Sequence, residues 1–328
     1  MRSSATRLGC HRCRCSTSVT DPVAALDCGS NSTRLLIVSG DGTALRREMR
    51  ITRLSQGVDA SGTLVPEALQ RTYDVLSEYR TFMDASGVSR GLLVATSAVR
   101  DAKNGAAFLD EARRRTGVEA TLLSGDQEAA YSYAGATADL APDDRPAMIV
   151  DVGGGSTELA VVLDNVMHSF SMQLGCVRVS ERALGRDVVT PAGDAAAREM
   201  IESELDRAWA GVPAFATLVG SVRLIGLAGT VATLAQLDAR LEVYDRDAVH
   251  HRVLTRSTVR FWRDTLARET AQARLARPGM VAGREDVLTA GLYVLDAVME
   301  RLGVDELLSS ENDILDGITS ALLEAECA

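Results

Sequence analysis

The chain has 328 residues, of which 46% are hydrophobic and 24% are charged, a length and composition that predict two globular domains. Acidic residues outnumber basic ones by 45 to 35, and the net charge of −10 excludes a broad surface for nucleic acid. No apolar run approaches the ~20 residues that span a bilayer, so no membrane partner is expected. The positive contacts for any anionic substrate must therefore be concentrated in one site.

The inventory of reactive residues excludes further classes of enzyme. The single lysine, Lys103, does not lie in a Gly-Lys-Ser/Thr sequence, which excludes a Walker-type phosphate loop. The four histidines pair with no acid at metal-ligand spacing, which disfavours zinc hydrolase and His-Asp phosphohydrolase chemistry. We expect His250 and His251 to decorate the surface rather than to act as acid or base. The scattered cysteines fit a reducing, cytoplasmic compartment.

Residues 1–20 carry three cysteines, Cys10, Cys13 and Cys15, and one histidine, His11. They lack the apolar core of a secretory signal. A metal knuckle with this spacing is a weaker interpretation than a disordered extension, so we leave residues 1–20 out of the fold. Whether they are a genuine part of the protein stays open.

The strongest signal is an internal repeat. Residues 26–38 align without gaps on residues 150–162, with six identities at a constant offset of 124. Each copy predicts a strand (23–27 and 147–152), a tight glycine turn and a returning strand (34–39 and 158–163). An offset this long indicates two duplicated domains rather than a solenoid.

The repeated segments have a chemistry that two ordinary glycine-rich hairpins would not need. Glycines and serines between two strands can direct successive N–H groups into a nest for phosphate oxygens. Asp27 and Asp151 end the first strand of each copy, where they can hold a divalent cation. The copies differ where Arg34 corresponds to Glu158, so one offers a cation to an anionic substrate and the other a carboxylate to Mg²⁺ or water.

The other predicted elements alternate between helices and strands. In chain order they are a helix at 65–86, a strand at 92–95, a helix at 105–116, a short strand ending at 124–125, a helix opened by Ser124, a linker at 141–146, helices at 174–184 and 192–211, a strand at 223–227 entering a turn at 228–230, and helices at 231–237, 259–269, 284–302 and 313–324. This pattern predicts an α/β protein with domains at 21–140 and 141–328 and a cleft between them. We expect the C-terminal helix to pack back on the first domain.

Several segments resemble one known family in its own order. They are residues 26–34, 51–58, 95–104, 123–129, 150–158, 174–182, 226–230 and the stretch from 284. They are similar to the exopolyphosphatase / guanosine pentaphosphate phosphatase family of the actin–sugar kinase–Hsp70 superfamily. The resemblance implies two duplicated actin-like, ribonuclease H-like domains, as in the short two-domain members. The chain departs from the family pattern at Ala228, where the family often has glycine, and at Ser55-Gln56-Gly57, where it often has Gly-Glu-Gly.

The resemblance also implies roles for the acids. Glu128 would orient or deprotonate the attacking water, Glu158 would be catalytic, and Asp151 and Asp27 would hold Mg²⁺. A guanidinium suits bidentate phosphate binding, so we expect Arg34 and Arg100 to be phosphate clamps and Arg178 a weaker candidate. The full set of expected phosphate-binding residues is Ser30, Asn31, Ser32, Arg34, Arg100, Gly153, Gly154, Gly155, Ser156 and Arg178.

The function expected from these residues is that of an exopolyphosphatase, which releases terminal orthophosphate from inorganic polyphosphate with Mg²⁺. Two alternatives stay open: hydrolysis of the 5′ γ-phosphate of guanosine pentaphosphate, a stringent-response activity, and a phosphate-ligand sensor without turnover. The acids Glu128 and Glu158 argue against the sensor. A sugar kinase is disfavoured because no aspartate base for a sugar pocket is found. A homodimer is the base-rate expectation.

Overall fold

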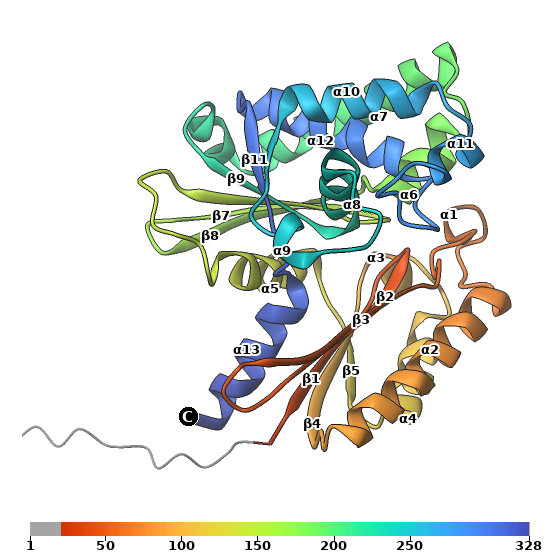
Figure 1. Ribbon diagram of the computed structural model, residues 1–328, viewed down its shortest axis with the longest axis vertical. Coiled ribbons are helices and arrows are strands. Elements are labelled where there is room, and N and C mark those ends of the chain that lie inside the picture. The colour runs from red at the N-terminus through yellow and green to blue at the C-terminus, as the bar shows by residue number, and fades with distance from the viewer. Residues whose placement is uncertain (1–20, 328) are drawn as a thin grey trace, which may run out of the picture.

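The computed structural model describes residues 21–327, which form two lobes, each built on one mixed sheet (Figure 1). The sheet of the first lobe has the order β3-β2-β1-β4-β5. Its strands are β1 (Val23–Cys28), β2 (Ser32–Val38), β3 (Ala44–Ile51), β4 (Arg90–Ala95) and β5 (Glu119–Leu122). The sheet of the second lobe has the order β10-β11-β9-β6-β7-β8. Its strands are β6 (Ala147–Val152), β7 (Thr157–Leu163), β8 (Val166–Met172), β9 (Arg223–Leu227), β10 (Val253–Thr255) and β11 (Glu306–Ser309).

The two sheets share one topology. In the first, β1 pairs antiparallel with β2 and parallel with β4, and in the second, β6 pairs in the same way with β7 and β9. The duplication predicted from the repeat is therefore confirmed, with β10 as an additional edge strand. The register places Asp27 opposite Arg34 and Asp151 opposite Glu158, so the position at which the two copies differ is the same in both hairpins.

The central strands β1 and β6 read as nearly continuous apolar runs because helices cover both faces of the sheets. The helices of the first lobe are α1 (Val58–Ser61), α2 (Pro66–Ala85), α3 (Ser97–Arg100) and α4 (Gly105–Thr116). Those of the second are α6 (Cys176–Val179), a π-helix (Ser180–Leu184), α7 (Pro191–Gly211), a 3-10 helix (Pro213–Leu218), α8 (Ala228–Ala239), α9 (Arg246–Val249), α10 (Arg256–Ala267), α11 (Ala271–Leu275) and α12 (Leu288–Leu302). The apolar faces of α2 and α4 fill the core of the first lobe, and α7, α10 and α12 fill that of the second.

Two further helices connect the lobes. The helix α5 (Gly125–Thr137) follows the first sheet but packs on β6, β7 and β8, whereas α13 (Ile314–Cys327) follows the second sheet but packs on β1, β2 and β4 (Figure 1). The two helices also pack on each other through Gly135 and Gly317. A Cβ atom on Gly135 would lie 1.9 Å from the carbonyl oxygen of Asp313, and one on Gly317 would lie 2.1 Å from that of Tyr131. Only glycine allows this close approach.

Some elements differ from the sequence prediction. The segment 174–184 is not one helix, because the short α6 passes into a π-helix, and residues 228–230 begin α8 rather than form a turn. The helix expected from 284 begins only at Leu288, after a loop that carries Arg284. The strands β3, β8 and β11 were missed; β3 is a largely exposed edge strand with a polar sequence, and the alternation of apolar residues that marks a strand is lost there.

None of the helices between residues 21 and 327 combines the length and the apolar character that crossing a membrane requires. The metal-knuckle alternative for Cys10, Cys13 and Cys15 concerns residues outside the described part of the chain.

Candidate active site

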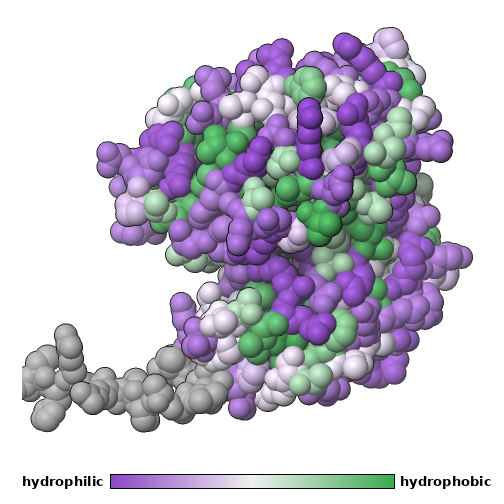
Figure 2. All heavy atoms as spheres, viewed as in Figure 1, coloured by the Kyte–Doolittle hydropathy of each residue, from purple (hydrophilic) through white to green (hydrophobic). Residues whose placement is uncertain are grey.

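Both glycine loops open into one pocket between the lobes, with an empty volume of about 620 Å³. Figure 2 shows the molecule hollowed between its two lobes. Ten of the residues predicted from the sequence line this pocket: Asp27, Ser30, Asn31, Ser32, Arg34, Glu128, Asp151, Gly153, Gly154 and Ser156. Thr96, Ser97, Cys176, Gly229 and Arg284 complete much of the wall. The fold therefore brings the two copies of the repeat together at a single site.

The second glycine loop (residues 153–156) is held by its carbonyl groups. The carbonyl oxygens of Gly153 and Gly154 accept hydrogen bonds of 2.9–3.1 Å from the first amides of α6, and that of Gly155 accepts one of 2.7 Å from Nε of Arg178. In a trans peptide the C=O and the next N–H point in opposite directions. The N–H groups of Gly154, Gly155 and Ser156 are thus turned away from α6. Gly154 and Ser156 line the pocket, whereas Gly155 lies beside it.

The first glycine loop (residues 29–31) is held in the same manner. The carbonyl oxygen of Ser30 accepts from the amide of Ser55 at 2.9 Å, and that of Asn31 accepts from the amides that follow β3. The loops also touch each other, because a Cβ atom on Gly155 would lie 2.6 Å from Oγ of Ser97, which itself bonds Oγ of Ser30 at 2.9 Å. The two nests therefore face one shared space.

Four buried carboxylates lie around this space: Asp27, Asp151, Glu128 and Glu158. Burial raises the pKa of Asp151 to about 6 and that of Glu158 to about 7, and in Glu158 the charge of Asp151 adds to the effect. Burial and the neighbouring charge of Glu158 also raise the pKa of Glu128 well above its ordinary value. Glu158 does not itself line the pocket; its Oε1 accepts a hydrogen bond of 2.7 Å from Oγ of Ser171 on β8.

Two carboxylate oxygens in the cluster have no hydrogen-bond partner although they are buried. They are Oδ1 of Asp27 and Oε2 of Glu128. An unpaired buried acceptor is costly, and Mg²⁺ is commonly held by one or two carboxylates together with water and substrate oxygens. Asp27 and Asp151, which both line the pocket, therefore fit the cation that the sequence resemblance implied.

The three predicted arginines are placed differently from one another. The guanidinium of Arg34 lines the pocket but is shared between two carboxylates, those of Asp27 at 2.7 Å and Asp313. Arg100 is not among the lining residues; its Nη1 donates to the carbonyl of Leu123 at 2.8 Å and lies 3.8 Å from Oε2 of Glu128. Its other terminal nitrogen is buried without a partner. In this arrangement the charge of Arg100 therefore interacts with Glu128 from outside the pocket wall.

Arg178, expected as a phosphate ligand, has both of its terminal nitrogens engaged by carboxylates. Besides its bond to Gly155, it donates through Nη1 to Asp59 at 2.8 Å and through Nη2 to Asp101 at 2.5 Å. It lies beside the pocket rather than in its wall. In this structure its charge is neutralised by two acids of the first lobe.

Sequence reasoning assigned no role to Arg284, which the structure places in the pocket wall. Arg284 is buried, and its guanidinium makes no ion pair or hydrogen bond within the described part of the chain. It lies against Gly229, where a Cβ atom would come within 1.7 Å of Nη1. An uncompensated buried guanidinium beside two anion nests is a strong candidate phosphate contact. The only available signal was the position of Arg284 in the stretch that resembles the family.

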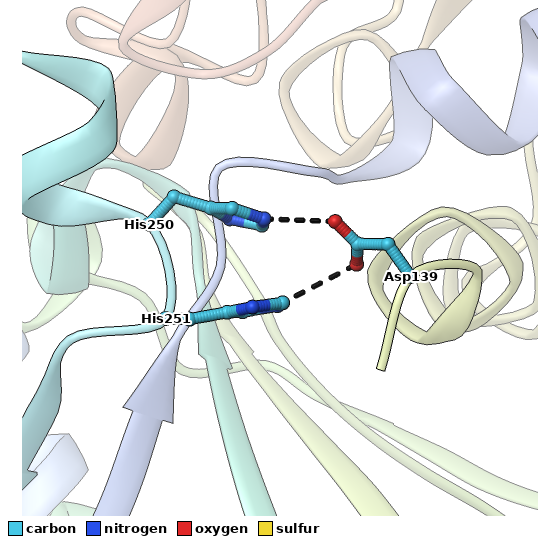
Figure 3. Close-up of side chains that lie close together, drawn as sticks. All are labelled: Asp139, His250 and His251. Carbon is cyan, nitrogen blue, oxygen red and sulfur yellow. Dashed lines mark hydrogen bonds and ion pairs between the residues drawn. The ribbon is translucent and has the colours of Figure 1, made fainter. Parts of the chain in front are cut away.

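The two adjacent histidines also depart from the prediction, because the fold pairs both with Asp139 (Figure 3). Nε2 of His250 lies 2.8 Å from Oδ2 of Asp139, and Nε2 of His251 lies 3.5 Å from Oδ1. However, Nδ1 of His250 accepts a hydrogen bond from the amide of Glu311 at 3.0 Å. The proton of the neutral ring is therefore on Nε2, which donates to Asp139 and is unavailable to a metal. We therefore interpret these three residues as a structural contact and not as a metal centre.

Known proteins that are similar to this chain belong to the family that the sequence motifs resemble. Residues 36–326 match the model of the Ppx/GppA phosphatase family. The chain is 37% identical over 316 residues to a protein named Exopolyphosphatase 2 from Mycobacterium tuberculosis, covering 92% of this chain and 98% of that relative. It is 27% identical over 314 residues to a Guanosine-5'-triphosphate,3'-diphosphate pyrophosphatase from Vibrio atlanticus, covering 94% of this chain and 61% of that relative.

A solved structure shows the same similarity in three dimensions. The crystal structure of an exopolyphosphatase-like protein superposes with a TM-score of 0.86 at 33% sequence identity, covering 93% of this chain and 99% of the other. The similarity thus extends over both lobes. With its duplicated sheets and the two glycine loops that meet in the pocket between them, the chain belongs to the Ppx/GppA phosphatase family.

Proposed function

We propose that this protein is an exopolyphosphatase that hydrolyses the terminal phosphoanhydride bond of inorganic polyphosphate and releases orthophosphate. One observation carries the proposal: two nests of backbone N–H groups and a cluster of buried carboxylates face the same pocket. The nests suit phosphate oxygens, and the carboxylates suit a divalent cation and an attacking water. The relative named Exopolyphosphatase 2 supports the same substrate.

In the proposed reaction the terminal phosphate binds to the N–H groups of both loops and to the guanidinium of Arg284. Glu128, which lines the pocket and has a buried Oε2 without a hydrogen-bond partner, orients a water for attack and takes its proton. Asp27 and Asp151 would hold Mg²⁺, which when bound supplies positive charge to the phosphoryl oxygens, and the charge of Glu158 would act from outside the pocket wall. The protein's part is therefore mainly positioning and charge compensation, as phosphoryl transfer requires.

The test is orthophosphate release by the purified protein with Mg²⁺ from four substrates: long-chain polyphosphate, short polyphosphate, guanosine pentaphosphate and ATP. We expect release from polyphosphate, and we expect Glu128→Ala to abolish it. Release from none of the four, with phosphate binding retained, would contradict the proposal and favour a sensor.

A second cavity favours guanosine pentaphosphate as the alternative substrate. It has an empty volume of about 1160 Å³ and shares Arg34, Gly229 and Arg284 with the phosphate pocket. Its other walls include the apolar Ala232 and Val281, together with polar groups on α8 and the exposed Tyr244. An apolar wall with a few polar groups suits a nucleoside better than a polyphosphate chain.

Competition separates the two substrates. If the cavity binds a nucleoside, guanosine tetraphosphate will inhibit the release of orthophosphate from polyphosphate, and Gln236→Leu will relieve the inhibition without changing turnover of polyphosphate. If guanosine tetraphosphate at millimolar concentration leaves the rate unchanged, the cavity does not serve guanosine nucleotides.

A further inference from the structure

The contacts of Arg178 indicate a function other than substrate binding. Its side chain, only 10% exposed, uses Nε for the carbonyl of Gly155 in the second lobe and its two terminal nitrogens for Asp59 and Asp101 in the first. These three bonds, which we name the Arg178 clasp, join the second glycine loop to two separate elements of the opposite lobe. Asp59 lies on α1, and Asp101 caps the end of α3.

The bond to Gly155 fixes the direction of one peptide group in the nest. Because the Gly155 carbonyl is held towards Arg178, the N–H of Ser156 is directed to the opposite side, where Ser156 lines the phosphate pocket. The first residues of α6 hold the two preceding carbonyls through backbone amides. Arg178 is thus the one side chain that completes the orientation of this loop in the described structure.

The bonds to the first lobe hold the guanidinium in place. The donors of a guanidinium lie in one plane, and here each of its three nitrogens donates to a different partner. Asp59 is an effective partner at neutral pH even without Arg182, although the hydrogen bond from Arg182 and the charges of Arg182 and Arg178 lower its pKa further. If the lobes separate, both acids move away, and the nitrogen that holds Gly155 loses its fixed orientation.

We propose that Arg178 is a positioning residue: it makes the arrangement of the second glycine loop depend on contact between the lobes, so that the phosphate nest is complete only when the cleft is closed. The effect on turnover rests on the proposed function, whereas the effect on the loop does not. Arg178 would therefore couple closure to binding without touching the substrate.

The alternative is that Arg178 releases its acids and binds phosphate directly. The two possibilities differ in what the acids should do. For a clasp, Asp101→Asn removes an essential partner and weakens substrate binding in the same direction as Arg178→Ala. For a phosphate ligand, Asp101→Asn frees the guanidinium and leaves binding unchanged or improves it.

The kinetic experiment measures kcat and KM for polyphosphate in Arg178→Ala, Asp101→Asn and the double variant. Because a misplaced binding group costs about one order of magnitude or more, we expect KM to rise roughly ten-fold in each single variant, with kcat less affected. The double variant should be no worse than Arg178→Ala, because both changes break the same contact. An unchanged or lower KM in Asp101→Asn would overturn the proposal.

Arg182→Ala is the matched control. Arg182 also donates to Asp59 through two nitrogens but has no contact with the glycine loop, and it is 46% exposed. We expect its KM to remain within about two-fold of wild type, since exposed ion pairs contribute little. An effect of Arg182→Ala as large as that of Arg178→Ala would show that the charge of the region, not the clasp, matters, and would contradict the proposal.

A second readout is independent of catalysis. Amide hydrogen exchange of Cys176 and Val177, whose N–H groups donate to the carbonyls of Gly153 and Gly154, should be faster in Arg178→Ala and Asp101→Asn than in wild type and Arg182→Ala, with no substrate present. If wild type hydrolyses none of the substrates tested, the proposed function fails but this readout still decides the clasp. Unchanged exchange in Arg178→Ala would overturn the clasp whatever the activity.

Discussion

Two acids in the first turn of α5 have opposite surroundings. Glu128 is buried in the pocket wall beside other carboxylates, whereas Asp126 is exposed and accepts a hydrogen bond of 2.8 Å from Ser169. An acid near a helix N-terminus often does no more than stabilise the helix. The structure separates the two acids, because of the two only Glu128 lines the pocket.

This difference predicts their kinetic effects. Glu128→Gln keeps the size of the side chain but removes the base, so we expect kcat for orthophosphate release to fall roughly 10²–10⁴-fold. Asp126→Asn should leave kcat within about two-fold, as a surface change usually does. Equal effects of the two substitutions, measured by steady-state kinetics, would contradict the role of Glu128.

Arg284 gives a second prediction at this scale. Arg284→Gln removes a charge-assisted contact worth about 1.5–3 kcal/mol, so KM for polyphosphate should rise roughly ten- to one-hundred-fold. Arg260→Gln, a change of the same kind on the exposed face of α10, is the control. A KM for Arg284→Gln equal to that of Arg260→Gln would show that the guanidinium does not contact substrate.

The buried carboxylates also predict how stability depends on pH. The pKa of Glu158 is about 7 in the folded protein and near 4.5 in the unfolded chain, so the folded state binds more protons between these values. The free energy of unfolding of the metal-free protein should therefore fall as pH rises from about 4.5 to about 7. Urea unfolding in EDTA will show this slope, and Glu158→Gln should flatten it.

An exposed acid with a lowered pKa provides the control. Glu119 is an exposed acid whose pKa is lowered by its hydrogen bond with Arg113, so Glu119→Gln should not flatten the slope. If the free energy of unfolding of the metal-free wild type shows the same dependence on pH as that of Glu158→Gln, Glu158 does not carry a raised pKa.

At the scale of elements, the crossing of α5 and α13 determines how the lobes are held. Gly135→Ala would force a methyl group against the backbone near Asp313, and we expect it to reduce the free energy of unfolding by about 1–3 kcal/mol or more. Ala134→Ser adds one atom at the neighbouring exposed position and should cost much less. Denaturant unfolding compares the two; equal stability would contradict the close crossing.

The elements also show where sequence reasoning succeeds and fails. The strand Arg223–Leu227 and the helix Gly105–Thr116 are predicted to the residue, because each has a clear apolar pattern and a clear end. The edge strand β3 was missed because its exposed faces carry charged side chains. The π-helix at 180–184 has no local signal; its backbone follows from packing on α7 rather than from propensity.

At the scale of the whole molecule, the repeat allowed the candidate site to be predicted but not completed. Residues at equivalent positions of duplicated sheets must lie near one another once the lobes face each other, so Asp27, Asp151 and the glycines could be named in advance. Arg284 and the contacts of Arg178 could not, because they depend on how distant loops meet across the cleft. Charge and residue type alone do not distinguish a free guanidinium from a paired one.

The most direct test of the central claim is to follow the oxygen of the attacking water. Polyphosphate is hydrolysed by the wild-type protein with Mg²⁺ in water enriched in ¹⁸O, and the released orthophosphate is analysed by mass spectrometry after a single turnover. Attack on the terminal phosphoryl group, with Glu128 as base, predicts one ¹⁸O atom in each orthophosphate released and almost no release by Glu128→Gln. Orthophosphate without ¹⁸O, or equal release by Glu128→Gln, would contradict the account.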